Sequence, residues 1–110
     1  IYGDGEQSRD FTYVKDIASG AIKASEKQGS DTYNIASGRR ITVNEMVETL
    51  DEVMEENVEK THVEQPEGDA RHTHADPTKA KKELDFEAEK DFEEAVKECV
   101  DWVRRTEGLN

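Results

Sequence analysis

The sequence has few of the residues that build a disulfide scaffold, a membrane anchor or a nucleic-acid-binding surface. It contains one cysteine, Cys99, so no disulfide can form within the chain, and we expect a reducing compartment, the cytoplasm. No apolar run approaches the length that spans a bilayer and no leader opens the sequence, so we expect neither membrane insertion nor secretion. The net charge of −12, from 27 acidic residues against 15 Lys plus Arg, repels DNA and anionic membranes. We therefore expect no nucleic-acid and no membrane partner.

The composition indicates a small apolar core inside a heavily charged shell. Of the 110 residues, which we assign to a single domain over residues 1–110, 33% are hydrophobic and 38% are charged. A chain of this size buries roughly two thirds of its unfolded surface, so one modest core is expected. The acidic excess would suit a halophilic protein, because high salt screens the repulsion among carboxylates. A melting temperature that does not rise in molar KCl would contradict this hypothesis.

Three segments have both helical periodicity and a helix start signal. Residues 42–57 open with a capping box formed by Thr42 and Glu45. An Asp-Pro pair precedes residues 78–84 and predicts a short helix with the proline at its first position. The last helix is predicted to begin at Asp91. Its inner stripe is expected to comprise Phe92, Ala95, Val96, Cys99, Val100 and Val103.

Three further segments favour short strands, and one more favours a helix. Residues 9–14, 32–37 and 58–64 are rich in strand formers or alternate in polarity. Between the first two, a helix is predicted to begin at Asp16 as its N-cap and to stop before Gly29. Its buried face is expected to comprise Ile17, Ala18, Ala21 and Ile22. Together these elements predict a mixed α/β (α+β) fold with short strands and about four helices.

The opening loop contains the strongest candidate for ligand binding. Gly3 and Gly5 form a G-x-G, but a strand and not a helix is predicted after it, so a simple turn is the better interpretation. Arg9 lies beside this donor-rich loop, and its planar guanidinium can bond two oxygens of a phosphate or carboxylate at once. The alternative is an internal ion pair of Arg9 with Asp10 or Asp16. The pattern alone does not separate these two possibilities.

The histidines, Cys99 and Trp102 do not occur in a sequence pattern that is typical of a catalytic or metal site. His72 and His74 lie two residues apart in a polar segment, but a metal site needs three or four ligands, and we interpret them as solvated loop residues. His62 is expected in a strand. Cys99 falls in an apolar helical stripe and is predicted to be a small core residue, and Trp102 is predicted to anchor the last helix. The sequence contains no Ser/His/Asp motif and no Tyr-x-x-x-Lys.

Taken together, four stretches resemble the C-terminal part of the NAD-dependent epimerase/dehydratase family, the extended short-chain dehydrogenases/reductases that include UDP-glucose 4-epimerase. They occur in the order of the family and cover nearly the whole chain. The stretches are IYGDGEQSRDFTYVKDIASGAI, YNIASGRRITVNEM, EGDARHTHADPTKAKKELDF and FEEAVKECVDWVRR.

The resemblance implies that this chain is the substrate-binding fragment of a larger enzyme. In the family, an N-terminal Rossmann domain binds NAD and carries the Ser/Thr, Tyr and Lys that move hydride and protons. The parent would be an NAD-dependent isomerase of nucleotide-sugar metabolism, transiently oxidising the sugar at C4, and a homodimer in its full-length form. The sequence of this chain contains no counterpart of these catalytic residues. We therefore expect no catalytic residue, no metal and no tightly bound NAD in the fragment itself.

The resemblance also implies which residues hold the substrate, a nucleotide sugar of the UDP class. Arg9 would bond the diphosphate, Gln7 would add a polar contact in the same loop, and Arg71 would be a second basic contact. The best-known epimerases carry an arginine just before Glu-Gly-Asp, where this chain has Gln-Pro, so Arg71 would have to replace it. Thr73 falls where those epimerases place a bulkier residue beside the sugar, and its small side chain would leave room for an N-acetylated hexose.

Two functions of other classes are also compatible with the sequence. The chain could be a non-catalytic module that uses the opening loop to hold a nucleotide or a protein partner, or a fragment that only packs and dimerises. An upstream glycine-rich motif with a Tyr-x-x-x-Lys in the same gene would favour the enzyme. Titration with UDP and UDP-sugars would separate a binding role from a purely structural one.

Overall fold

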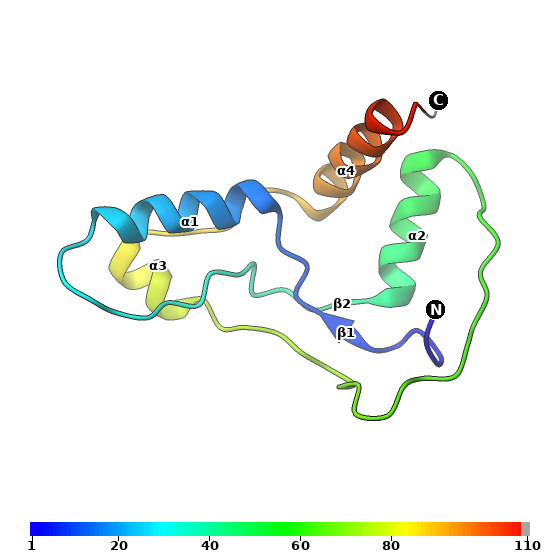
Figure 1. The fold of residues 1–110 in the computed structure, drawn as a ribbon, viewed down its shortest axis with the longest axis horizontal. Helices are drawn as coiled ribbons and strands as arrows, with labels where there is room; N and C mark the ends of the chain where they lie inside the picture. The colour runs from blue at the N-terminus through cyan, green and yellow to red at the C-terminus, as the bar shows by residue number, and fades with distance from the viewer. Residues whose placement is uncertain (109–110) are drawn as a thin grey trace.

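The computed structural model describes residues 1–108 and, within them, shows four helices and one two-stranded sheet (Figure 1). The mixed α/β fold predicted from the sequence is therefore confirmed. The elements follow in the order β1 (Ser8–Arg9), α1 (Val14–Glu26), β2 (Ile41–Thr42), α2 (Val43–Met54), α3 (Thr78–Leu84) and α4 (Phe92–Thr106).

The molecule is flat and open. Its principal extents are 49 × 35 × 19 Å and its radius of gyration is 16.4 Å, whereas a compact domain of this length has a radius of about 13 Å. Helices α1 and α3 lie at one end and α2 packs on α4 at the other, with the β1–β2 pair between them (Figure 1). Within residues 1–108, no helix combines the length and the apolar character needed to cross a bilayer.

The predicted helices are confirmed where a local cap specifies them. The Thr42 hydroxyl accepts a hydrogen bond from the Glu45 amide at 3.0 Å, and α2 follows, although it ends at Met54 and not at Asn57 because Glu55 turns into the left-handed region, with a φ of 57°. The carboxylate of Asp91 accepts from the Glu94 amide at 3.4 Å at the start of α4. For α3 the predicted bounds, Thr78–Leu84, are confirmed, and only the cap was wrong by one position, because Pro77 and not Asp76 is the N-cap residue.

The strand predictions were mostly wrong, because a strand needs a partner that sequence alone does not supply. Strand β1 ends at Arg9 and α1 begins at Val14, so residues 11–14 are not a strand. Residues 32–37 and 58–64 form no strand, although Val63 makes a single bridge with Tyr2.

The orientation of α1 is the reverse of the prediction. Its buried residues are Asp16 and Gly20, whereas the four residues expected inside are exposed. Gly20 explains the reversal: a Cβ there would lie 2.6 Å from Cγ2 of Ile35, so only glycine lets the helix approach this closely. Tyr13, and not Asp16, is the N-cap; Asp16 instead accepts hydrogen bonds from the amides of Glu89 and Lys90, each at 3.4 Å.

The core is small and lies mostly at the α1–α3 end. Phe86, 1% exposed, packs with Ala80 and Leu84. Partly buried side chains surround this cluster, namely Ala24, Tyr33, Ile35 and Ala88. Val96 and Val100 of α4 are buried, and α4 packs on α2. Cys99 is exposed and Trp102 is 59% exposed, so the predictions of a core cysteine and an anchoring tryptophan were wrong.

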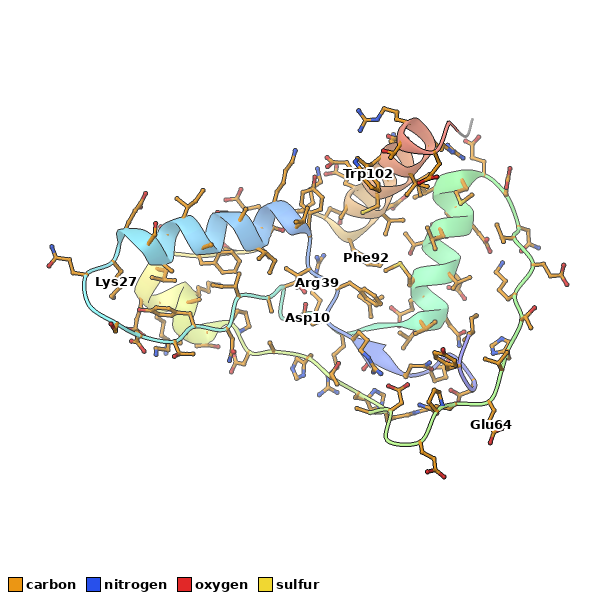
Figure 2. All side chains as sticks on the ribbon, viewed as in Figure 1. Asp10, Lys27, Arg39, Glu64, Phe92 and Trp102 are labelled. Carbon is orange, nitrogen blue, oxygen red and sulfur yellow. The ribbon has the colours of Figure 1, made fainter. Side chains whose placement is uncertain are left out.

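Asp10 joins the two ends of the molecule. Figure 2 shows it near Arg39, between α1 and the β1–β2 pair. Its carboxylate accepts hydrogen bonds from the amides of Ser37, at 3.2 Å, and Gly38, at 2.9 Å, and from the hydroxyls of Ser37 and Thr12. Burial alone would raise the pKa of Asp10, but these hydrogen bonds together hold the pKa below its ordinary value of 3.8.

Candidate functional site

Strand β1 is held on both sides, which fixes the position of Arg9. On one side Ser8 and Arg9 pair antiparallel with Thr42 and Ile41 of β2. On the other, the Ser8 amide donates to the Arg71 carbonyl at 2.9 Å, and the Thr73 amide donates to the Ser8 carbonyl at 3.0 Å. The predicted basic loop around Arg71 is thus aligned with the opening segment, 62 residues away in the sequence.

The loop before β1 is tied to the N-terminus of α2. The amide of Val43 donates to the Gln7 carbonyl at 3.0 Å, and the amide of Asn44 donates to the Gly5 carbonyl at 2.9 Å. Gly5 has a φ of 78°, and a Cβ there would overlap the Asn44 side chain, so glycine is required. Gln7 is only 4% exposed, and its side-chain amide donates to the Tyr2 carbonyl at 2.9 Å. The predicted turn at the G-x-G is confirmed.

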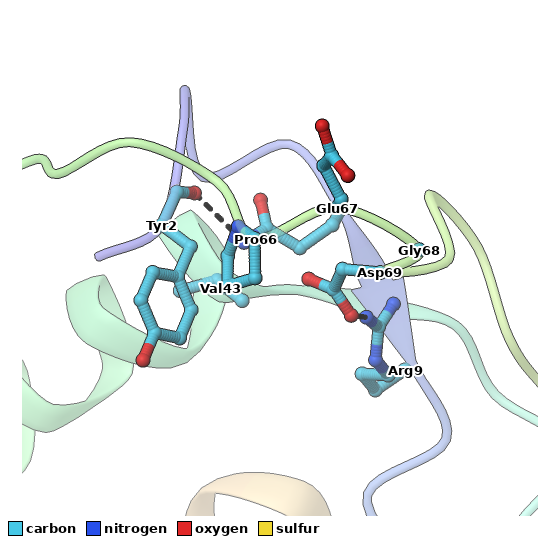
Figure 3. A pocket seen from close by; sticks show the side chains of 8 residues that line it. Tyr2, Arg9, Val43, Pro66, Glu67, Gly68 and Asp69 are labelled. Atoms are coloured by element: carbon cyan, nitrogen blue, oxygen red, sulfur yellow. Dashed lines mark hydrogen bonds and ion pairs between the residues drawn. The ribbon is translucent and has the colours of Figure 1, made fainter.

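A pocket of about 510 Å³ opens beside this loop (Figure 3). Its walls combine apolar groups with one cation, one amide and two acids. The lining residues are Tyr2, Gln7, Arg9, Val43, Pro66, Glu67, Gly68 and Asp69. The arrangement offers a face for a flat or apolar group beside a guanidinium for an anion.

Arg9 lines the pocket and points toward Asp69 (Figure 3). Its Nη2 lies 3.0 Å from Oδ1 of Asp69 and donates to the Ala70 carbonyl at 2.8 Å, and its Nη1 donates to the Ser8 carbonyl at 2.7 Å. The side chain keeps 28% of its surface exposed. An internal ion pair does exist, but with Asp69 and not with Asp10 or Asp16. The carbonyl bonds orient the guanidinium, and the exposed carboxylate is the partner that an incoming anion could replace.

The other two predicted contacts lie outside the lining of this pocket. Arg71 is exposed and makes a two-point ion pair with Asp4, at 2.8 and 3.0 Å. These hydrogen bonds from Arg71, together with one from the Glu6 amide, lower the pKa of Asp4 from 3.8 to about 2. Thr73 is exposed and contacts β1 through its backbone amide. The structure therefore brings Gln7 and Arg9 together and leaves Arg71 and Thr73 on neighbouring surface.

The three histidines fasten the 58–77 connection to other segments. Nδ1 of His62 lies 2.7 Å from the Gly3 carbonyl, and since a carbonyl only accepts, this nitrogen carries the proton. Nδ1 of His72 lies 2.7 Å from the buried Ser8 hydroxyl. His74 accepts from Arg40 at 3.4 Å. These are bonded, exposed residues of a connecting segment, and across residues 1–108 no three potential ligands gather around one point.

Sequence reasoning missed six of the eight residues that line the pocket, namely Tyr2, Val43, Pro66, Glu67, Gly68 and Asp69. Val43 was predicted only as part of a helix, and Tyr2 was treated only as part of the opening glycine loop. The Gly68-Asp69 pair was recognised as part of a loop, but its proximity to Arg9 depends on a contact across 60 residues. No local pattern reports such a contact.

Comparison with known proteins identifies the family. Residues 1–99 match the family model described as GDP-mannose 4,6 dehydratase. The chain is 37% identical over 105 residues to a UDP-glucuronate 4-epimerase of Thermodesulfobacterium geofontis, covering 94% of this chain and 32% of that protein. It is also 37% identical over 103 residues to a UDP-glucose 4-epimerase of Bacillus subtilis, covering 90% of this chain and 30% of that protein.

Solved structures agree with the sequence matches. The UDP-glucose 4-epimerase of Thermotoga maritima, crystallised with UDP-glucose, superposes with a TM-score of 0.91 at 37% identity, over 96% of this chain and 34% of that one. A UDP-N-acetylglucosamine 4-epimerase of Methanobrevibacter ruminantium, in complex with UDP-N-acetylmuramic acid, gives 0.90 at 36% identity, over 96% and 34%. The chain thus spans about a third of the length of these relatives. It belongs to the NAD-dependent family of nucleotide-sugar epimerases and dehydratases.

Proposed function

We propose that this chain is the substrate-binding part of a longer NAD-dependent nucleotide-sugar epimerase or dehydratase, and that it grips the diphosphate of a UDP-sugar through Arg9. The observation that carries the proposal is the placement of Arg9 on the wall of the 510 Å³ pocket, with its side chain partly exposed. The similar proteins of known structure were crystallised with UDP-sugars, which supports this class of ligand.

The electrostatics of the chain make this arginine necessary. A diphosphate must bind to a molecule of net charge −12, so positive potential has to be supplied locally. Asp69 neutralises Arg9 in the structure, and the phosphate would replace that carboxylate while the bonds to Ser8 and Ala70 keep the guanidinium in place. Gln7, held by Tyr2, would be the neutral polar contact beside it.

Arg71 and Thr73 complete the proposed contacts from the adjacent segment. Arg71 would have to leave Asp4 to reach a phosphate. Because both side chains of this pair are about half exposed, breaking the ion pair would cost little free energy. Thr73, joined to β1 through its backbone, would face the sugar and leave space for an N-acetyl group.

The described residues do not fit NAD. A dinucleotide site needs a glycine-rich turn that opens a helix, whereas the turn at Gly3 and Gly5 leads into β1. NAD and the catalytic residues are therefore assigned to the remaining part of the proposed parent. We take that part to be a Rossmann domain, and the assembled enzyme to be a cytoplasmic homodimer.

Kinetics of the parent protein test the role of Arg9. Arg9→Ala should raise KM for the UDP-sugar roughly 10- to 150-fold, since a charge-assisted hydrogen bond contributes roughly 1.5–3 kcal/mol. The affinity for NAD should stay unchanged. Arg105→Ala on the exposed side of α4 is the matched control. An unchanged KM in Arg9→Ala would contradict the proposal, and binding of UDP-sugar without turnover would favour the non-catalytic module.

A further inference from the structure

The connection between α2 and α3 is attached to the opening segment at two points. At the first, the Gly3 amide donates to the Val63 carbonyl at 2.7 Å, and the Val63 amide donates to the Ile1 carbonyl at 2.8 Å. At the second, the Ser8 amide donates to the Arg71 carbonyl at 2.9 Å. These bonds fix both ends of the stretch between Val63 and Arg71, so movement within it is confined to the middle.

The middle of this stretch is a turn, residues 66–69, which we call the flap. Each of its residues is exposed. Among the residues that the structure describes, the flap backbone makes one hydrogen bond, from the Asp69 amide to the Pro66 carbonyl at 3.4 Å, and that bond lies inside the flap. Gly68 has a φ of 82°, and open space surrounds the position that a Cβ would take there. Backbone hydrogen bonds therefore do not hold the flap against the rest of the chain.

The side chain of Arg9 holds the flap in place. Its Nη2 lies 3.0 Å from Oδ1 of Asp69, and the same nitrogen bonds the Ala70 carbonyl, just beyond the flap, at 2.8 Å. A further hydrogen bond to Asp69, from the Gln65 amide at 3.3 Å, comes from the same loop. The flap residues line the pocket together with Arg9 (Figure 3). The ion pair therefore keeps the flap on the wall of the pocket.

An anion on Arg9 would break this attachment and repel the flap. A phosphate oxygen that takes the place of the Asp69 carboxylate leaves the flap without its ion pair. The flap also carries Glu67, so a closed flap would hold two carboxylates on the wall of the pocket that contains the anion. Like charges at such short range repel, and most strongly where water is partly excluded. Binding of an anion and closure of the flap therefore oppose each other.

We propose that the flap is a latch, closed in the free protein by the ion pair of Arg9 with Asp69 and released when a diphosphate binds to Arg9. The inference rests on the proposed function in one respect, that the anion binds at Arg9. The latch also makes the site selective. A singly charged carboxylate gains little by replacing Asp69, which is already held in position, whereas a diphosphate brings several negative charges to the same guanidinium.

Backbone ¹⁵N relaxation of the 110-residue chain measures the latch through the order parameter of Gly68. Gly20, inside α1, marks the level of rigid backbone, and Gly29, which has open space around it, marks that of a turn without a latch. Without ligand, Gly68 should lie near the rigid level of about 0.85, and saturating pyrophosphate should lower it below about 0.6. Acetate at the same concentration should leave it unchanged. A value that stays the same or rises with pyrophosphate, as it would if the flap closed on the anion, would overturn the latch.

A matched pair of variants tests the role of Asp69. Asp69→Ala should lower the order parameter of Gly68 without any ligand, whereas Glu67→Ala, which removes a carboxylate from the same flap but no bond to Arg9, should not. Equal values in the two variants would overturn the latch. Calorimetric titration of the same samples and of Arg9→Ala with pyrophosphate separates the latch from the proposed function. Equal affinity in Arg9→Ala and the unchanged chain would end the proposed function. Weaker binding by Arg9→Ala, together with a rigid Gly68 in Asp69→Ala, would end the latch alone.

Discussion

Among the residues that the structure describes, the polar groups beside the pocket find partners within the chain, whereas the backbone groups of residues 33–36 next to α1 do not. The strand β1 is bonded on both sides, and both arginines of the region are paired with acids. At the other end an apolar face of α1 is exposed, and residues 33–36 make no backbone hydrogen bond to any part of the chain that the structure describes. The difference teaches that contacts among the described residues account for the polar groups at the pocket end but not for the backbone of residues 33–36.

The largest effect is expected from the core that supports the α1–α3 end. Phe86→Ala should lower the free energy of unfolding by about 3–5 kcal/mol, because Phe86 is the largest fully buried side chain and the core around it is small. Urea unfolding followed by circular dichroism measures the loss. Phe11→Ala, at a partly buried position, is the control and should lose less. Equal losses would show that this end does not depend on the Phe86 cluster.

A smaller effect is expected where the two ends meet. Asp10→Ala should cost about 2–3 kcal/mol, because the amides of Ser37 and Gly38 lose an ionised acceptor. Since the pKa of Asp10 is lowered on folding, this stabilisation is present above pH 3.8 and is lost as the pH falls through the lower folded value. Urea unfolding at pH 7 and pH 3 measures both predictions. The exposed Asp101→Ala is the control, and a cost at pH 7 no greater than the control's would refute the role of Asp10.

A modest effect is expected at the pocket, where a carboxylate competes with the ligand. Asp69→Asn should tighten binding of inorganic pyrophosphate to the chain about two- to fivefold, because a partly exposed ion pair contributes at most about 1 kcal/mol. Glu67→Gln removes the same charge from the same pocket without touching a bond to Arg9. Isothermal titration calorimetry compares the two. If both variants bind equally, the gain comes from net charge and not from release of Arg9.

The smallest effect on the fold is expected at the exposed pair of Asp4 and Arg71. Arg71→Ala should return the pKa of Asp4 from about 2 toward 3.8, since the hydrogen bonds from Arg71 are the main cause of the shift. Any stabilisation from this pair is present above pH 3.8 and is lost as the pH falls toward 2. A carbon-detected NMR titration of the Asp4 carboxyl measures the shift. A pKa that stays near 2 in the variant would show that the pair does not persist in solution.

The sequence predicted those elements whose signals lie within a few residues of one another. The caps at Thr42 and Asp91 are such signals, and the helices after them formed where expected. The strands were predicted poorly, because the residues 32–37 have strand composition but no partner among the described residues. The face of α1 was inverted, because the close contact of Gly20 with Ile35, and not apolarity, sets which side packs.

The same distinction holds at the candidate site. Gln7 and Arg9 were found from one short loop, and the structure places both on one pocket. The acid beside Arg9 was predicted to be a sequence neighbour, yet it is Asp69, which comes from a distant segment aligned with β1 by backbone bonds. The charge of a side chain predicts that it will form an ion pair. Which acid it pairs with depends on how segments far apart in the sequence are aligned.

Asp10 follows Arg9 directly in the chain, so a single peptide unit joins the two residues. The Arg9 guanidinium lines the pocket, while the Asp10 carboxylate accepts hydrogen bonds from the amides of Ser37 and Gly38. A shift of residues 37 and 38 would therefore reach the Arg9 guanidinium through a single peptide unit. An anion would then bind more weakly at the pocket, even if every side chain that lines the pocket were intact.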